Sequence, residues 1–95
     1  MVTIKVNSMG HGEPLEFQVV LLEGKSQTQY VVTMARRTWE DLTPGSTAEA
    51  CIEAAFRFLL DRESQESILK RFDVAVIPRY FPDFERALPR YLSKS

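Results

Sequence analysis

The sequence has little of the residues that build covalent or metal-centred sites. Among 95 residues it contains one cysteine, Cys51, and one histidine, His11. A single cysteine cannot form a disulfide within the chain, and it cannot complete a cysteine-ligated metal cluster. We therefore expect a protein of the reducing cytoplasm that carries no metal and no other cofactor.

The sequence also lacks long hydrophobic runs and an excess of either charge. No run approaches the ~18 apolar residues of a membrane-spanning helix, and residues 1–12 lack the basic and then apolar order of an export signal. With 12 basic and 13 acidic residues the net charge is −1, so no overall field attracts nucleic acid or anionic membranes. We expect a soluble, unexported protein without membrane contact, whose partners bind local surfaces.

The remaining composition indicates one globular domain that spans residues 1–95. Hydrophobic residues make up 44% of the chain and charged residues 26%, with four glycines, five prolines and no low-complexity segment. A chain of this length supports one hydrophobic core. We expect disorder only at the ends, including a flexible C-terminal tail.

The first third of the chain, residues 1–34, predicts a three-stranded antiparallel meander. Apolar and polar residues alternate in three segments, at residues 2–7, 15–22 and 28–34. The connections between them, SMGHGEP and EGKSQ, are rich in turn-forming residues. Val20 and Leu22 make the second segment apolar on both faces, which is typical of a strand that is central or covered on both sides.

The middle of the chain, residues 35–62, predicts a short helix over 35–42 and a long helix over 47–62. Ser46 lies three residues before Glu49, the spacing of a capping box at a helix N-terminus. The charges of the long helix follow one narrow stripe, formed by Glu49, Glu53, Arg57 and Asp61. Such a helix packs on more than one side, so the sheet and either the C-terminal segment or a second subunit should cover it.

Residues 63–95 predict short C-terminal helices. We expect one over residues 64–71 and another from Pro82 through Leu88, since proline favours the first position of a helix. Residues 72–77 fit either a fourth strand or a helix capped by Asp73, and the helix is slightly favoured. The whole chain thus predicts an α+β fold, in which the meander packs against one long helix and short C-terminal helices complete the core.

Two conspicuous residues have ordinary structural interpretations. His11 lies between Gly10 and Gly12, but the lysine and the following helix of a phosphate-binding loop are missing, so a flexible hairpin turn is favoured. Cys51 falls inside the apolar long helix, with His11 as its only possible base, which favours a buried structural cysteine over a nucleophile. No catalytic or metal-binding residues are predicted.

The C-terminal segment interleaves arginines with aromatic residues, a combination enriched at protein interfaces and able to contact nucleic acid. The residues of this candidate partner-binding surface are Arg71, Arg79, Tyr80, Phe81, Phe84 and Tyr91. The alternative is that the aromatic side chains cover the long helix while the arginines stay in water. In that case the aromatic residues have a structural role.

The stretch QYVVTMARRTWEDLTPGSTAEACIEAAFRFLLDRE, residues 29–63, resembles the ribbon-helix-helix repressors. The resemblance implies an obligate dimer whose paired strands read bases in the major groove. The implied base-reading residues are Gln29, Val31 and Thr33, and the implied phosphate contact is the helix start at Thr47. The predicted meander pairs the same strand within the chain, so the two interpretations compete.

The segments MVTIKVNSMGHG and FRFLLDRESQESILKRFDVAVIPRYFP resemble a group of short uncharacterised bacterial proteins. This resemblance implies a bacterial, single-domain protein and carries no activity. From the sequence we expect a non-enzymatic protein-interaction or regulatory module that forms a homodimer and binds another protein. A dimeric DNA-binding regulator and a small enzyme with an unrecognised site are the alternatives.

Overall fold

The computed structural model describes residues 2–10 and 12–92 and confirms the predicted α+β fold. Three strands form an antiparallel meander: β1 (Thr3–Gly10), β2 (Leu15–Glu23) and β3 (Ser26–Met34). Each strand is one or two residues longer than its alternating segment predicts. His11, predicted to lie in a turn, is outside the described residues, and so are residues 93–95 at the end of the predicted flexible tail.

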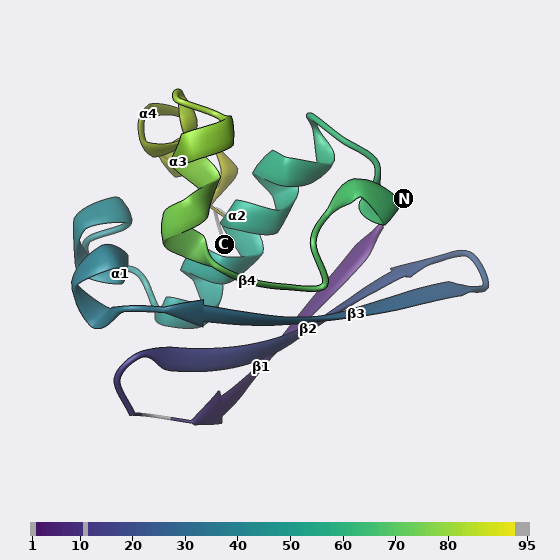
Figure 1. Cartoon of the computed structure of the whole chain (residues 1–95), viewed down its shortest axis with the longest axis horizontal. Helices are drawn as coiled ribbons and strands as arrows, with labels where there is room; N and C mark the ends of the chain where they lie inside the picture. Colours follow the sequence, from purple (N-terminus) through teal and green to yellow (C-terminus); the bar gives the residue numbers. More distant parts are fainter. Residues whose placement is uncertain (1, 11, 93–95) are drawn as a thin grey trace.

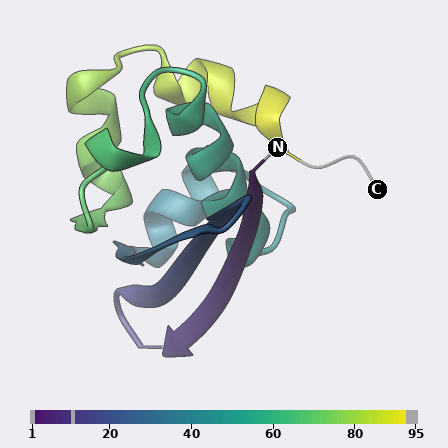
Figure 2. The same cartoon turned by 90° about the vertical axis from the view of Figure 1, so that its right-hand side faces the viewer.

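A short fourth strand, β4 (Arg71–Asp73), pairs parallel to β3 and completes a sheet of order β1-β2-β3-β4. The helices lie together on one face of this sheet (Figure 1, Figure 2). The predicted central position of residues 15–22 is confirmed, because β2 lies between β1 and β3. The alternative, a strand covered on both sides, does not apply, since Val20 and Leu22 are only half-buried on the face of β2 that points away from the helices.

The β2–β3 connection is a two-residue turn made by Gly24 and Lys25, between the paired residues Glu23 and Ser26. Gly24 has φ +59, while no described non-glycine residue has a positive φ. A positive φ at the first central residue alone matches a type II′ turn, whose twist suits the flanking strands. A side chain at position 24 would strain this turn.

Helix α1 (Arg36–Leu42) leads through a turn into the long helix α2 (Ala48–Leu60). The predicted cap at Ser46 is wrong by one residue, because the N-cap is Thr47, whose hydroxyl accepts the Ala50 backbone N–H at 3.0 Å. The Ser46 hydroxyl instead donates to the Thr43 carbonyl at 2.9 Å within the preceding turn. Both Ser46 and Thr47 have a hydroxyl that can cap a helix, but the Ser46 hydroxyl is used by the preceding turn, and Thr47 is therefore the cap.

Helix α2 packs on two sides, as its narrow charged stripe predicts. Residues 56 and 58 are about 200° apart around a helix of 100° per residue, so their rings point in opposite directions. Phe56 meets Tyr30 of the sheet, with ring centroids 5.2 Å apart. Phe58 meets Phe84 of the C-terminal segment at 5.0 Å. Within the described chain, both sides of this helix are therefore covered without a second subunit.

The C-terminal segment consists of short elements, as predicted, but their bounds differ from the predicted ones. They are η1 (Gln65–Ser67), β4, η2 (Val74–Val76), α3 (Ile77–Tyr80), α4 (Phe84–Ala87) and η3 (Leu88–Tyr91). The predicted helix over 64–71 stops after η1, because Ile68 is extended and leads the chain alongside β3. Residues 72–77 combine both predicted alternatives: the strand comes first, and then Asp73 caps η2 by accepting the Ala75 N–H at 2.9 Å.

The helix predicted to begin at Pro82 begins instead at Phe84, in α4. The Phe84 N–H donates to the Phe81 carbonyl at 2.9 Å, which closes a turn over Pro82 and Asp83. This turn directs both Phe81 and Phe84 toward Phe58. Packing on α2 therefore sets the start of this helix, against the local preference of the proline.

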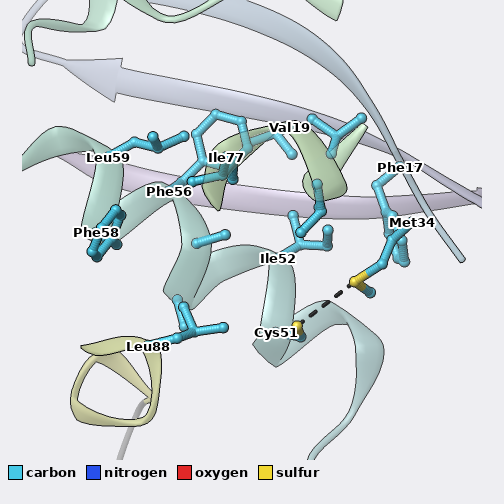
Figure 3. Close-up of a cluster of buried hydrophobic side chains, with 14 of the residues drawn as sticks. Phe17, Val19, Met34, Cys51, Ile52, Phe56, Phe58, Leu59, Ile77 and Leu88 are labelled. Carbon is cyan, nitrogen blue, oxygen red and sulfur yellow. Dashed lines mark hydrogen bonds between the residues drawn. The ribbon is translucent and has the colours of Figure 1, made fainter. Parts of the chain in front are cut away.

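One part of the core lies between the sheet and α2, and another part, with Phe58, Phe84 and Leu88, lies between α2 and the C-terminal segment (Figure 3). Leu15, Phe17, Val19 and Leu21 of β2 are at most 5% exposed. Cys51 is fully buried, and its sulfur lies 3.7 Å from that of Met34 (Figure 3). Burial raises the pKa of the Cys51 thiol, which keeps it protonated and unreactive at neutral pH. This geometry matches the structural role predicted for Cys51.

Candidate functional site: an apolar groove between α2 and α3

A groove of about 460 Å³ lies where the C-terminal end of α2, the η1 segment, β4 and α3 meet. Its lining residues are mostly apolar: Leu59, Glu63, Ser67, Ile68, Leu69, Phe72, Val76, Ile77, Tyr80 and Phe81. A concave, largely apolar surface with a few polar groups is the usual form of a binding site. We refer to this surface as the α2–α3 groove.

Two exposed side chains border the α2–α3 groove. Leu69 is 58% exposed and Tyr80 is 70% exposed. Met9 is the third large apolar residue of the described chain with such exposure, at 54%, and it lies on β1. A single exposed apolar residue is ordinary, whereas several around a hollow indicate an interaction site. Leu69 and Tyr80 lie together around a hollow and so indicate an interaction site.

The exposure of Leu69 and Tyr80 follows from the local backbone. Ile68 is extended and 3% exposed, so its neighbour Leu69 must point the other way, toward solvent. Tyr80 and Phe81 are likewise neighbours with different surroundings: the Phe81 ring packs edge-on against Phe58 at 5.8 Å, while Tyr80 projects from the end of α3. All four residues line the groove, but in each pair one residue packs inward while the other is exposed at its border.

The corner between β4 and η2, beside the groove, is fixed by Asp73. One carboxylate oxygen accepts the Thr33 hydroxyl at 2.6 Å, and the other accepts the Ala75 N–H. The Val31 N–H also donates to the Lys70 carbonyl at 2.8 Å, so backbone and side chain both attach this corner to β3. The groove therefore has one wall tied to the sheet and another formed by α2.

The polar groups of the groove are few. Glu63 follows the end of α2 and is half-buried, and it brings the only carboxylate among the lining residues. Ser67 shares a hydrogen bond of 3.1 Å with Ser64. A single carboxylate in an apolar setting favours a ligand that places a positive charge beside an apolar group.

The predicted aromatic and basic residues do not form one surface. Tyr80 and Phe81 line the groove, and Arg79 is exposed beside them on α3. Arg71 lies on the other side of the sheet, since its neighbour Phe72 packs against Phe56 and successive strand residues alternate. The two remaining residues, Phe84 and Tyr91, pack against α2.

Phe84 is 0% exposed, which excludes it from direct contact with a partner. Tyr91 is half-buried and packs edge-on against Phe58 at 5.7 Å. For these two residues the structural alternative, in which aromatic side chains cover the long helix, describes the geometry. The sequence analysis missed Ile68 and Leu69, although two adjacent aliphatic residues in a polar run were a signal.

A polar cluster fastens the C-terminal segment to the end of α2. The Arg62 guanidinium donates to the Asp83 carboxylate at 2.6 Å and lies 3.8 Å from the centroid of the Phe58 ring. The Tyr91 hydroxyl donates to the Asp61 carboxylate at 2.7 Å. The hydrogen bond from Arg62 lowers the pKa of the Asp83 carboxyl. The pKa of the Arg62 guanidinium is raised, mainly by its hydrogen bond to Tyr91 and also by Asp83. These contacts hold the segment that carries Phe81.

The residues implied by the ribbon-helix-helix resemblance lie elsewhere. Gln29, Val31 and Thr33 occupy β3, which pairs with β2 on one edge and, at Val31–Thr33, with β4 on the other. The Thr33 hydroxyl is bonded to Asp73. The hydroxyl of Thr47 caps α2. While these pairings hold, β3 cannot form the intersubunit ribbon of that family.

No protein-family model matches the chain, and neither a curated protein nor a solved structure does. Within residues 2–10 and 12–92, no three histidine, cysteine, aspartate or glutamate side chains are grouped to hold a metal ion. In the same part of the chain, no helix has the length and apolar character needed to cross a bilayer.

Proposed function

We propose that this protein is a non-enzymatic interaction module whose α2–α3 groove binds an apolar segment of a partner protein. The observation that carries the proposal is the pairing of a largely apolar groove with two exposed residues on its border, Leu69 and Tyr80. Aromatic residues that close over a partner's side chain are frequent sources of binding energy at interfaces. The groove has room for one or two apolar side chains of the partner.

The lining also favours a particular partner chemistry. Glu63 adds one carboxylate to an apolar surface, and Arg79 lies outside the lining on α3. A segment with an apolar anchor followed or preceded by lysine or arginine would pair with Glu63 and fill the groove. A segment with an acidic residue at that position would leave two carboxylates facing each other.

Selection from a random peptide library displayed on phage, against the immobilised protein, would test the proposal. We expect the selected peptides to share apolar anchors with a neighbouring basic residue. Leu69→Asp and Tyr80→Asp should each weaken binding about tenfold or more, the loss typical of a central interface residue of at least ~1.4 kcal/mol. Both positions are exposed, so the substitutions should leave the fold intact.

The matched control is Gln27→Asp, at an exposed position on β3 that is not among the residues lining the groove. Its peptide affinity should equal that of the wild type. Selected peptides that bind all the variants equally, or a selection that yields no binding peptide, would contradict the proposal.

A further inference from the structure

The edge of the sheet at β1 is long and has few protecting features. β1 has eight residues and pairs with β2 on one side, and no other described strand pairs with it. The opposite edge, β4, has only three residues. Proteins usually protect exposed edge strands with proline, charged side chains, β-bulges or very short length. The strand TIKVNSMG has no proline and a single charge, Lys5, on the face away from the helices, and its one irregularity lies near its end, between Ser8 and Gly10.

The core-facing side chains of β1 are only partly covered. Ile4 and Val6 are half-buried, although their partners on β2, Leu21 and Val19, are fully buried. Helix α2 packs against β1, so Ile4 and Val6 are open on the outer side of the strand, where no other described strand lies. A strand added at this edge would shield Ile4 and Val6 and would satisfy the free backbone groups of β1.

We propose that β1 pairs antiparallel with β1 of a second copy, around a two-fold axis at Val6, so that two sheets join into one. Directly opposite residues of an antiparallel pair lie on the same face. An axis at Val6 places Val6 against itself, Ile4 against Ser8 and Lys5 against Asn7. It also uses the strand most fully, since it pairs residues from Thr3 to Met9.

Other registers are less favourable. An axis at Lys5 would place two lysines directly opposite each other, which is destabilising. An axis at Ile4 would use only Thr3 to Lys5 of the strand on each side. An axis at Asn7 would carry the pairing further into the irregularity between Ser8 and Gly10. The single lysine thus helps to select the register at Val6.

A second copy fits this edge for two further reasons. A two-fold axis lets one strand satisfy both sides of the interface, so no different partner surface is required. The net charge of −1 also puts little electrostatic cost on bringing two copies together. Because β1 and β4 are opposite edges of the sheet, the α2–α3 groove beside β4 would stay open in the dimer.

Asn7 gives a direct test, because it is exposed and would face Lys5 of the other copy twice in each dimer. Asn7→Lys should raise the dimer dissociation constant roughly two- to thirty-fold through two like-charge pairs, and Asn7→Glu should lower it by a similar factor. The double variant Lys5→Glu with Asn7→Lys should restore dimerisation. The measurement is molar mass by light scattering over a range of concentrations.

The controls are Gln27→Lys and Gln27→Glu, at an exposed position on β3 away from the edge. They should leave the dissociation constant unchanged. A 10.9 kDa monomer at every concentration would overturn the proposal. So would a dimer that ignores charge at Asn7, that responds to charge at Thr3 instead, or that dissociates with Tyr80→Asp, since these results assign the contact to another register or to the groove.

Discussion

Phe58 should carry more of the stability of the C-terminal segment than any other contact with α2. Its ring is fully buried and meets three rings edge-on: Phe81 at 5.8 Å, Phe84 at 5.0 Å and Tyr91 at 5.7 Å. The Arg62 guanidinium covers the same ring at 3.8 Å. Replacement of Phe58 by leucine removes these ring contacts and keeps an apolar side chain of similar length.

The expected loss follows from these contacts. Three edge-on ring pairs contribute about 1.5–4.5 kcal/mol, and the guanidinium contact adds roughly 0.5–1 kcal/mol. Leucine recovers part of the burial, so we expect Phe58→Leu to lower the free energy of unfolding by about 2–4 kcal/mol. Against a total stability of about 5–15 kcal/mol for a small domain, such a variant still folds.

Urea unfolding followed by circular dichroism measures this loss, and hydrogen exchange locates it. Protection of the amides in residues 81–91 should fall more than protection in β2 and β3. Phe56→Leu is the matched control, because Phe56 faces Tyr30 and Phe72 on the other side of α2. A loss below ~1 kcal/mol in Phe58→Leu, with unchanged exchange in residues 81–91, would refute the assignment of Phe58 as the anchor.

Two further predictions concern the Arg62–Asp83 contact and the N-cap of α2. The hydrogen bond from Arg62 lowers the pKa of Asp83, so this contact stabilises the fold above the ordinary aspartate pKa of about 4 and is lost as pH falls through the lowered value. Asp83→Asn should therefore unfold at lower urea than the wild type at pH 7, and the difference should disappear in acid; a difference independent of pH would contradict this. Thr47→Ala should cost about 0.5–2 kcal/mol in the same assay, and more than Ser46→Ala, because Thr47 is the N-cap. A larger loss at Ser46 would place the cap back at the predicted position.

The strands and α2 could be predicted because their signals are local. In β2 each core residue, from Leu15 to Leu21, alternates with a residue on the other face, and the pattern itself defines a half-buried strand. The cap of α2 shows the limit of such signals. Ser46 and Thr47 are both good caps, and the Trp39 indole N–H, which donates to the Ser46 carbonyl at 2.9 Å, helps to fix the turn that decides between them.

The C-terminal segment could not be predicted in the same way. Its elements have three or four residues each, too few for a periodic pattern to appear. Their conformations depend on distant residues: β4 forms because β3 offers an edge at Val31–Thr33, and α4 begins where Phe84 reaches Phe58. The groove is a product of these contacts, so a list of aromatic and basic residues could place Tyr80 there but also included the buried Phe84.

The α2–α3 groove and the β1 edge are both places where the described chain covers apolar side chains incompletely. At one edge of the sheet, β1 packs against α2 but has no described strand on its outer side, and Ile4 and Val6 stay half-buried. At the other edge, the C-terminal segment turns from β4 into α3 and leaves Leu69 and Tyr80 exposed around a hollow. Because the two surfaces lie at opposite edges of one sheet, substitutions at Asn7 and at Tyr80 should act independently. Loss of peptide binding without loss of the dimer, and the reverse, would show that the protein presents its groove and its pairing edge as separate surfaces.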